Sequence, residues 1–456
     1  MQNPKGKEIL PIGRSFHDFE ETVVGLPVEL MYTHLLLAGA SGAGKSTVMI
    51  HLTLEWAKLG LIPIFFDTKG DECQEIIKRI PFEERRRIRY LSFKAANFSI
   101  PILNSDRQIF PSAYHSASSV CKVIEDVSKR RGDALSVRQY RFLQESLYAV
   151  MKGAPLLAPG QQPSMLDVKE FLLTPSFRDS LLSALEVAYP EDGQILQICR
   201  ELKGKEKDLT FDALLSKIYP ITDEPTLSKV FAQRGATLDL QRIVSGDEGA
   251  IVLVDLSDLP VDILHLSGAI LFECFLNACF LRPKAKRIGA MFLLDEFYLY
   301  WSESMSAVTR ARSYRMGFVY AMQSEASISP RLMRTILDSI GCTMVMRCGG
   351  NYARLLSKQF GDRVPYKDLV ELPNYHCWIK TPQSVFSFQT IPLPKEAATP
   401  SAIPLPPAPP EEPPGPKRPK AETTEAAPTA ELPFEPDIHI DGEGYKLERI
   451  EWRCHP

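Results

Sequence analysis

The stretch His34-Leu35-Leu36-Leu37-Ala38-Gly39-Ala40-Ser41-Gly42-Ala43-Gly44-Lys45-Ser46-Thr47 decides the fold of this chain. A short apolar run, which predicts a buried strand, leads into the pattern G-x-x-x-x-G-K-S and then into a helical pattern over residues 47–59. The glycines allow backbone angles that other residues avoid, so the loop amides can converge on phosphate oxygens at a helix N-terminus. The sequence therefore predicts a nucleotide-binding phosphate loop.

Each residue of this loop is a candidate contact to the nucleotide. Lys45 would reach the β- and γ-phosphates, and the Ser46 hydroxyl group would bind Mg²⁺, so the predicted cofactors are ATP and Mg²⁺. A chance match of four fixed positions in a chain of this size arises roughly 1–2% of the time, and the flanking strand and helix make it rarer still. The predicted phosphate-binding residues are Gly39, Ala40, Ser41, Gly42, Ala43, Gly44, Lys45, Ser46 and Thr47.

The composition is that of a globular protein. The chain has 456 residues, of which 45% are hydrophobic and 24% charged, enough for one large or two ordinary cores. The formal net charge is −3, so any nucleic-acid contact must come from a local patch or from assembled subunits. The nine cysteines include no C-x-x-C pair, which favours reduced thiols in a cytosolic protein over disulfides or a zinc site.

No part of the sequence predicts a membrane span. Residues 1–7 lack the apolar core of a signal peptide. The most apolar helical stretch, residues 266–281, is interrupted by Glu273 and Asn277 and is shorter than the ~20 residues that cross a bilayer. We therefore expect a buried core helix and a cytoplasmic protein.

The chain divides into four regions by pattern. Residues 1–104 and 246–391 show short apolar runs that predict strands, at 61–66, 89–93, 250–255, 290–295, 317–322 and 343–347, with helical stretches between the later ones. Such alternation predicts an α/β fold with a mostly parallel sheet. Residues 105–245 carry Leu and Ala at helical spacing and predict an all-helical insertion domain.

The tail, residues 392–456, is a region of different composition. Residues 392–436 hold 15 of the 36 prolines, and such a segment buries too little apolar area to offset its ordering entropy, which predicts disorder. Residues 438–452 regain hydrophobic and aromatic side chains, which leaves three open interpretations: a partner-binding motif, a strand that docks on another subunit, and an inert end.

Two acidic residues follow the predicted strand at 290–294. ATP hydrolysis needs a carboxylate near the Mg²⁺ ion and a group that orients the attacking water. An apolar strand that ends in Asp295-Glu296, the pattern called Walker B, supplies both: Asp295 for the metal shell and Glu296 for the water. Asp255, which follows the strand at 250–254, is an alternative for the metal role.

Several polar side chains near the next strand are further candidates. Gln323 ends the strand at 317–322 and could sense the γ-phosphate, or simply cap the strand end. Arg310, Arg312 and Arg315 precede that strand; they could present an arginine finger to ATP on a neighbouring subunit, or form a solvated helix face. The cluster Arg85-Arg86-Arg87 with Arg89 could contact DNA phosphates, although the pattern favours a solvated helix end.

Together these motifs resemble the FtsK/HerA superfamily of hexameric motor ATPases and, within it, the TraG/TraD-type coupling proteins of conjugation and type IV secretion. The resemblance covers roughly residues 8–390. It rests on an ordered set of motifs: residues 34–47, Phe66-Asp67-Thr68-Lys69-Gly70-Asp71, Leu293-Leu294-Asp295-Glu296-Phe297, Arg312-Ser313-Tyr314 before Gly317, Ala321-Met322-Gln323-Ser324, and Leu355-Leu356-Ser357-Lys358-Gln359-Phe360-Gly361.

The resemblance implies a RecA-like core that assembles into a hexameric ring, binds ATP at subunit interfaces and moves DNA, or a DNA–protein substrate, through a central pore. By motif position Lys45, Ser46, Asp295, Glu296 and Gln323 inherit the ATPase roles, and Arg312 is the first candidate for the finger.

Two features depart from the family pattern. Coupling proteins usually begin with transmembrane helices, and none is predicted here, so contact with a membrane secretion complex would be peripheral. Arg315 and Met316 also stand where a shorter R-S-Y-G pattern would place Gly.

Three functions remain open at this point. The first is an ATP-driven DNA translocase of conjugative transfer. The second is a HerA-like motor that works with a nuclease in DNA repair or phage defence. The third is an NTP-binding scaffold with little hydrolysis, in which the helical insertion and the Pro-rich tail recruit partners; the Asp295-Glu296 pair argues against it.

Overall fold

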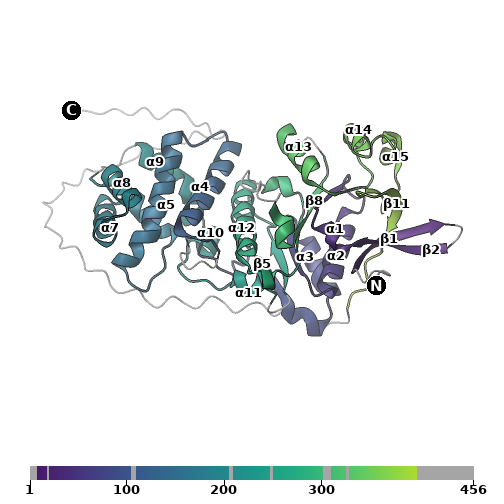
Figure 1. Ribbon diagram of the computed structural model, residues 1–456, viewed down its shortest axis with the longest axis horizontal. Helices are drawn as coiled ribbons and strands as arrows, with labels where there is room; N and C mark the ends of the chain where they lie inside the picture. The colour runs from purple at the N-terminus through teal and green to yellow at the C-terminus, as the bar shows by residue number, and fades with distance from the viewer. Residues whose placement is uncertain are drawn as a thin grey trace, which may run out of the picture. The chain divides into compact units, whose positions relative to one another are not determined.

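The computed structural model describes residues 8–17, 20–103, 109–204, 209–246, 250–300, 310–324 and 328–397. Its centre is a sheet of eleven strands in the order β2-β1-β11-β10-β9-β3-β8-β7-β4-β6-β5 (Figure 1). The seven strands from β9 to β5 are parallel, and the remaining four pair antiparallel. The predicted α/β fold with a mostly parallel sheet is confirmed.

The parallel strands coincide with the apolar runs of the sequence. They are β3 (Leu35–Ala38), β4 (Ile62–Asp67), β5 (Ile88–Ser92), β6 (Ile251–Asp255), β7 (Ala290–Leu294), β8 (Met316–Met322) and β9 (Cys342–Val345). Except in β5, every residue of these strands is buried, because both faces of the sheet are covered.

Alternate residues of the strands supply two separate cores. In β3, Leu35 and Leu37 face the core that includes Met49 and Trp56 of helix α2 (Lys45–Lys58). Leu36 and Ala38 face the other core, which holds the long helix α12 (Val261–Leu281) and the helices between β5 and β6. The phosphate loop thus leaves the middle of a sheet that is fixed on both sides.

The antiparallel part of the sheet is formed by both ends of the described chain. It consists of β1 (Ile9–His17), β2 (Glu20–Pro27), β10 (His376–Lys380) and β11 (Val385–Thr390). The two N-terminal strands have nine and eight residues. No strand was predicted for β10 or β11.

The shorter helical elements lie around the sheet. They are α1 (Val28–Met31), α3 (Asp71–Arg79), α13 (Pro330–Ser339), α14 (Gly350–Gln359) and α15 (Tyr366–Glu371), with 3₁₀ turns η1 (Phe82–Arg87), η2 (Lys284–Lys286) and η3 (Phe297–Leu299). The sequence segment 355–361 that supports the family resemblance lies on α14 and just after it.

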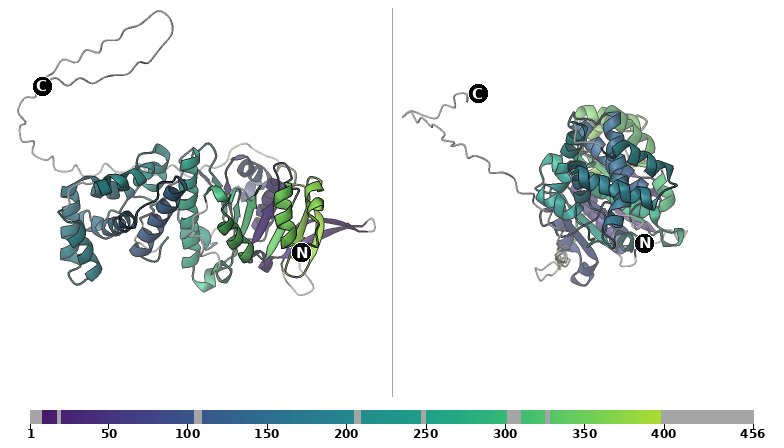
Figure 2. Two further views of the ribbon diagram at one scale, coloured as in Figure 1. Left: turned by 90° about the horizontal axis from the view of Figure 1, so that it is seen from above. Right: turned by 90° about the vertical axis from the view of Figure 1, so that its left-hand side faces the viewer.

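Eight helices fill the chain between β5 and β6 in the described residues. They are α4 (Ala113–Arg130), α5 (Val137–Leu157), α6 (Met165–Leu173), α7 (Pro175–Ala188), α8 (Gly193–Leu202), α9 (Leu209–Thr222), α10 (Pro225–Phe231) and α11 (Leu240–Val244). Figure 2 shows α12 between most of these helices and the sheet. The helices share one core with the sheet, so the boundaries of a separate insertion domain remain a prediction.

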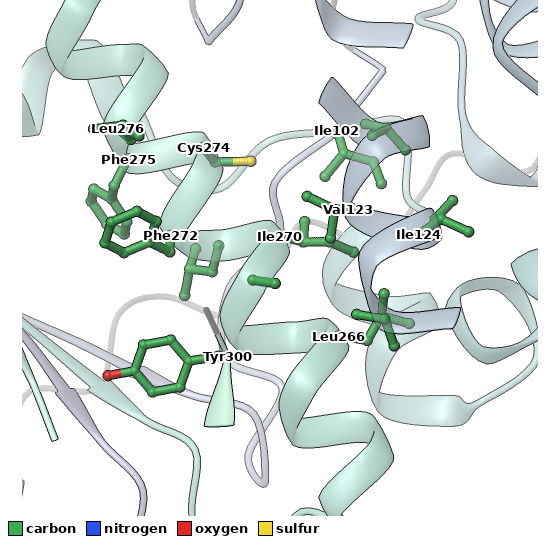
Figure 3. Close-up of a cluster of buried hydrophobic side chains, with 14 of the residues drawn as sticks. Ile102, Val123, Ile124, Leu266, Ile270, Phe272, Cys274, Phe275, Leu276 and Tyr300 are labelled. Carbon is green, nitrogen blue, oxygen red and sulfur yellow. The ribbon is translucent and has the colours of Figure 1, made fainter. Parts of the chain in front are cut away.

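Helix α12 corrects one expectation. With 21 residues it is longer than the sequence pattern suggested, and it is the one helix among the described residues that is long and apolar enough to cross a membrane. Most of it is nevertheless buried inside the protein. In Figure 3, Phe272 lies on the side of Tyr300, while Leu266 and Ile270 lie on the side of Ile124 in α4. The helix is part of the core, as predicted.

The remaining expectations concern cysteines and the tail. Eight cysteines lie in the described residues, where all are buried and none forms a disulfide; Cys454 lies outside them. Of the predicted disordered tail, residues 398–456 also lie outside the described part of the chain, as does the segment at 438–452.

Candidate active site

The phosphate loop has the backbone that its glycines predict. Gly42 and Gly44 take φ angles of 73° and 117°, and Gly44 is the N-cap residue of α2. The Nζ atom of Lys45 donates hydrogen bonds to the carbonyl oxygens of Gly39 (2.7 Å) and Ala40 (3.2 Å). Burial lowers the pKa of Lys45, while Glu296 and Asp295 oppose that shift. The lysine therefore lies inside its own loop, within electrostatic reach of both Walker B carboxylates.

The carboxylates at positions 295 and 296 lie at the carboxyl end of β7, as predicted. Asp295 is buried, and its Oδ2 atom accepts a hydrogen bond from Thr68 (3.1 Å) and lies 3.5 Å from Nζ of Lys69. Burial raises the pKa of Asp295 to about 6. Glu296 is buried as well, and its Oε1 atom accepts a hydrogen bond from Nε2 of Gln323.

The strand order explains how Gln323 reaches Glu296. Strand β8, which ends just before Gln323, lies between β3 and β7. The carboxyl ends of these three parallel strands meet at one edge of the sheet, so Gln323 stands between the phosphate loop and the Walker B pair. This contact makes Gln323 part of the candidate site instead of a simple strand cap.

The backbone of Glu296 is in an unusual conformation. Its φ angle of 45° places a non-glycine residue in the left-handed region, which is sparsely populated and is found where surrounding structure enforces it. The residue is the N-cap of the 3₁₀ turn η3, and its carbonyl oxygen accepts a hydrogen bond from the Leu299 amide (2.9 Å). The Oε2 atom of Glu296 is buried and has no protein partner. A carboxylate oxygen free of protein contacts is what a water-orienting group requires.

A further acidic residue enters the site from α3. The Ser46 hydroxyl group donates a 2.7 Å hydrogen bond to Oε1 of Glu72. The other carboxylate oxygen of Glu72 is buried and has no protein partner. Because the Ser46 proton points to Glu72, the lone pairs of the Ser46 oxygen stay available to a cation.

Asp67, Glu72 and Asp295 form a cluster of buried carboxylates. Each offers an oxygen, and these atoms all lie within 4.8 Å of one another. Burial and the neighbouring Glu72 raise the pKa of Asp67 to about 7, although backbone amides of Cys73 and Lys69 donate to its carboxyl oxygens. Burial also acts to raise the pKa of Glu72, but the influence of the neighbouring Asp67 and the hydrogen bond from Ser46 outweigh burial and lower that pKa. Hydroxyl and carboxylate oxygens of this kind suit Mg²⁺.

The alternative metal ligand, Asp255, lies elsewhere. Strand β6 is separated from β7 by β4, and Asp255 pairs in register with Asp67. Its carboxyl oxygens accept hydrogen bonds from the Tyr90 hydroxyl group (2.5 Å) and the Ser257 amide (2.9 Å). Asp255 therefore stabilises the carboxyl end of β6 and is not part of the carboxylate cluster.

The arginine candidates lie at the opposite edge of the sheet. Arg310 and Arg312 are exposed in the turn before β8, and Arg315 has a positive φ of 56° with its guanidinium group 5.7 Å from the ring centroid of Tyr32. Strand β8 has seven residues, or roughly 23 Å at about 3.3 Å per residue, between these arginines and Gln323. None of the three can act on ATP in its own subunit.

Two residues of the Arg85 to Arg89 cluster, Arg85 and Arg87, are held by contacts within the protein. Arg85 is buried and donates to the Ile80 carbonyl oxygen (3.2 Å). Arg87 donates to Glu84 (2.7 Å) and to the carbonyl oxygen of Ala57 (3.1 Å). These two side chains hold η1 against the helices and are not a free basic surface.

Sequence reasoning did not assign roles to Asp67 or Glu72. Asp67 was visible as an acidic residue at a strand end, in the same pattern as Asp295. Glu72 carried no signal in the chain itself, because its meeting with Ser46 depends on how α3 packs beside α2.

No protein-family model matches this sequence, and no curated protein is similar to it in sequence. Solved structures do match. The plasmid coupling protein TrwB in complex with ADP and Mg²⁺ superposes with a TM-score of 0.60 at 12% identity, over 82% of this chain and 89% of TrwB. The complex of TrwB with the non-hydrolysable ATP analogue ADPNP gives 0.58 at 12% identity, over 86% and 97%.

A VirB4 protein superposes on this chain about as well as TrwB does. VirB4 of Thermoanaerobacter pseudethanolicus matches with a TM-score of 0.58 at 13% identity, over 86% of this chain and 98% of VirB4. The fold is that of TrwB and VirB4. At such identities the likeness establishes the fold, and it confirms the predicted resemblance to conjugative coupling proteins at that level.

Proposed function

We propose that this chain is an ATP-hydrolysing motor that moves DNA, or a DNA–protein substrate, in a process of the conjugative-transfer or type IV secretion type. The observation that carries the proposal is the meeting of Lys45, Ser46, Glu296 and Gln323 around one edge of the sheet, with Glu296 bound to Gln323 and Ser46 bound to Glu72. The shared fold with TrwB, which has been solved with ADP and Mg²⁺, supports ATP and Mg²⁺ as the ligands.

Each residue of the site has a chemical task in this proposal. The loop amides from Gly39 to Thr47 and the Lys45 ammonium group hold the phosphates. Bound Mg²⁺ neutralises charge on the phosphates, and Ser46 and Asp295 would hold it. Glu296 orients and polarises the attacking water through its free oxygen, and Gln323 reports the state of the site to β8.

The proposal includes a ring of subunits, most simply a hexamer. Since Arg310, Arg312 and Arg315 lie far from the phosphate loop of their own subunit, any of them could reach ATP only on a neighbour. Arg312 is the first candidate because it opens the Arg312-Ser313-Tyr314 motif on which the family resemblance rests. The cytoplasm is the proposed location, with DNA as the proposed substrate and with protein partners bound by the helices between β5 and β6 and by the Pro-rich tail.

ATP turnover with and without DNA tests the proposal. The wild-type chain should hydrolyse ATP with Mg²⁺, and DNA should stimulate turnover. Glu296→Gln should keep ATP binding but lose roughly a hundredfold or more in kcat, because the orienting carboxylate is lost. Lys45→Ala should lose ATP binding itself.

The control is Glu75→Ala, which removes a partly exposed glutamate of α3 that pairs with Lys78 and Arg79. This variant should behave as wild type. A wild-type chain that binds ATP but turns it over equally slowly as Glu296→Gln, with or without DNA, would contradict the motor and favour an NTP-binding scaffold.

A further inference from the structure

An aromatic side chain lies against the phosphate loop. Tyr375 directly precedes β10, and a Cβ atom placed on Gly44 would be 2.9 Å from the Cδ1 atom of its ring. The ring therefore packs on the last glycine before Lys45. The residue is nevertheless 46% exposed, so its ring is not a core side chain.

The backbone of Tyr375 is held in place from two sides. Its φ angle is 64°, in the left-handed region that tyrosine rarely adopts. Its amide donates to the Ala43 carbonyl oxygen in the phosphate loop (2.9 Å), and its own carbonyl oxygen accepts from the Thr390 amide (2.8 Å). The chain thus keeps an unfavourable conformation that sets a half-exposed aromatic ring beside the nucleotide loop.

The geometry points to Tyr375 as the residue that stacks on the base of the nucleotide held by this loop. This inference rests on the proposed function and extends it, since it assigns a contact to the base of the nucleotide. Phosphate contacts do not distinguish nucleotides from one another, whereas an aromatic face next to the loop offers a stacking partner for a planar base. A tyrosine ring can stack on any of the bases, because every base has a planar π-face. Stacking should therefore favour nucleotides over bare phosphate chains without selecting one particular base.

The test compares ATP with inorganic tripolyphosphate, which has the phosphates and lacks the base. Both affinities are measured on the full chain with Mg²⁺, by calorimetry or by competition with a fluorescent ATP analogue. Tyr375→Ala should weaken ATP binding by about tenfold and leave tripolyphosphate binding within twofold. Tyr375→Phe, which keeps the ring, should restore ATP affinity. Tyr114→Ala, which removes an equally exposed tyrosine of α4, is the matched control.

The outcomes separate this inference from the proposed function. If the wild-type chain binds neither ATP nor tripolyphosphate, the nucleotide site itself fails. If it binds both and Tyr375→Ala weakens both equally, the ring supports the loop and does not contact a base. If Tyr375→Ala weakens neither, the stacking role is also wrong.

An independent observation concerns the turn that follows Glu296. The Nη1 atom of Arg130, the last residue of α4, donates hydrogen bonds to the carbonyl oxygens of Tyr298 (3.0 Å) and Leu299 (3.1 Å). These carbonyls belong to η3, which starts directly after Glu296. Tyr300 also fixes the same turn, since its hydroxyl group donates to the Asp295 carbonyl oxygen (3.1 Å) and its ring stacks on Phe66 of β4.

We infer that Arg130 is a positioning residue through which the helices between β5 and β6 control Glu296. The φ angle of Glu296 is unfavourable, so the turn after it must be held for the side chain to keep its place. Arg130 contacts that turn from α4, a separate element, whereas Phe297 and Tyr300 lie in the same chain segment as the turn. A partner that moves α4 would therefore change the position of the water-orienting carboxylate.

Arg130→Ala tests this inference, with Arg131→Ala as the control, because Arg131 contacts Asp262 on α12 instead (Nε to Oδ1, 3.5 Å). Arg130→Ala should reduce kcat about tenfold or more with an unchanged Kd for ATP, since small misplacement of a catalytic group is costly. Hydrogen exchange at the amides of Leu299 and Tyr300 should become faster in the absence of nucleotide. Arg130→Lys should restore part of both effects.

Two results would overturn the positioning role. One is unchanged amide exchange and kcat in Arg130→Ala; the other is an equal change in Arg131→Ala, which would indicate loosening of the whole helical layer. A wild-type chain without turnover would contradict the proposed function, and the exchange measurement would still test the contact.

Discussion

The pairing of Ser46 with Glu72 shows how a second carboxylate can prepare a metal ligand. Glu72 accepts the hydrogen bond that the Ser46 hydroxyl group donates, so the lone pairs of the Ser46 oxygen face away from Glu72. Groups behind a ligand commonly tune metal affinity by 10–100-fold. The buried, unpartnered oxygen of Glu72 also adds negative potential where the cation would sit.

We predict that Glu72→Ala raises the Mg²⁺ concentration for half-maximal ATP turnover by about tenfold. Binding of ATP in the presence of EDTA should stay close to wild type, because the loop amides and Lys45 do not depend on Glu72. Mn²⁺ binding followed by electron paramagnetic resonance gives the same comparison without turnover. Equal Mg²⁺ dependence in Glu72→Ala and wild type would mean that Glu72 supports α3 alone.

The pKa of His265 gives a pH prediction. Burial and the charges of Arg130 and Arg131 lower this pKa to about 4, while Asp262 acts in the opposite direction. The folded state thus binds the proton less tightly than the unfolded state, whose pKa is about 6.5. Stability that is present above pH 6.5 is therefore lost as the pH falls toward 4.

His265→Asn should flatten the pH dependence in that window. We expect the loss of unfolding free energy between pH 6.5 and 4 to shrink by about 1–2 kcal/mol, after a discount because the ring is partly exposed. Urea unfolding at pH 7, 5.5 and 4.5 measures it. Parallel curves for variant and wild type would show that other groups dominate the acid response.

Among the elements, α12 is tightly packed at Gly268. A Cβ atom at this position would lie 2.6 Å from the Cβ atom of Tyr300, so the helix and the segment after Glu296 approach closely there. Figure 3 shows Tyr300 beside α12. An added methyl group must push Tyr300 or bend the helix.

Gly268→Ala should destabilise the protein by about 1–3 kcal/mol, as expected for overpacking, and should also lower ATP turnover because Tyr300 follows Glu296 closely. Gly193→Ala is the matched control, since no atom lies within 4 Å of its Cβ position and alanine favours helices. Urea unfolding and turnover are measured together. A loss of stability without any loss of turnover would show that the site tolerates movement of Tyr300.

The sequence predicted elements well where a strand was covered on both faces. Continuous apolar runs such as 61–66 and 290–294 have few other interpretations, and the motif of the phosphate loop predicts a strand directly before it. It predicted β10 and β11 poorly, because strands such as Val385–Thr390 are partly exposed and mixed in polarity. Their place in the sheet depends on β1, hundreds of residues earlier in the chain.

The candidate site was predictable in the same uneven way. Lys45, Ser46, Asp295 and Glu296 follow local patterns with known chemistry. Glu72, Tyr375 and Arg130 reach the site through packing between elements that are distant in sequence, and no local pattern reports such contacts. The proposed action of one of the three arginines on a neighbouring subunit depends on an assembly, so a single chain carries no signal for it.

For the whole molecule, the position of the arginines gives a test of ring formation. Arg312→Ala and Lys45→Ala should each abolish turnover alone. Mixed subunits should regain it, because a Lys45→Ala subunit can offer Arg312 to the intact loop of its Arg312→Ala neighbour across a head-to-tail interface. With random mixing in equal amounts, about a quarter of the sites should recover.

Turnover of the mixture against composition measures this effect. The same experiment with Arg310→Ala and Arg315→Ala identifies the finger, and Arg315, which lies over Tyr32, should serve as the structural control. Mixed oligomers that form without any recovery would contradict action between subunits for the residue tested.

Strands β5 and β6 are neighbours in the sheet and run parallel, yet more than a hundred residues separate them. Any parallel pair needs a crossover connection of about a dozen residues or more. The eight helices lie within the crossover connection that joins β5 to β6. A change in the length of the connection between β5 and β6 leaves every strand pairing unchanged. Those helices that do not contact the turn after Glu296 could therefore vary in length while the pairing of the strands at the candidate site stayed the same.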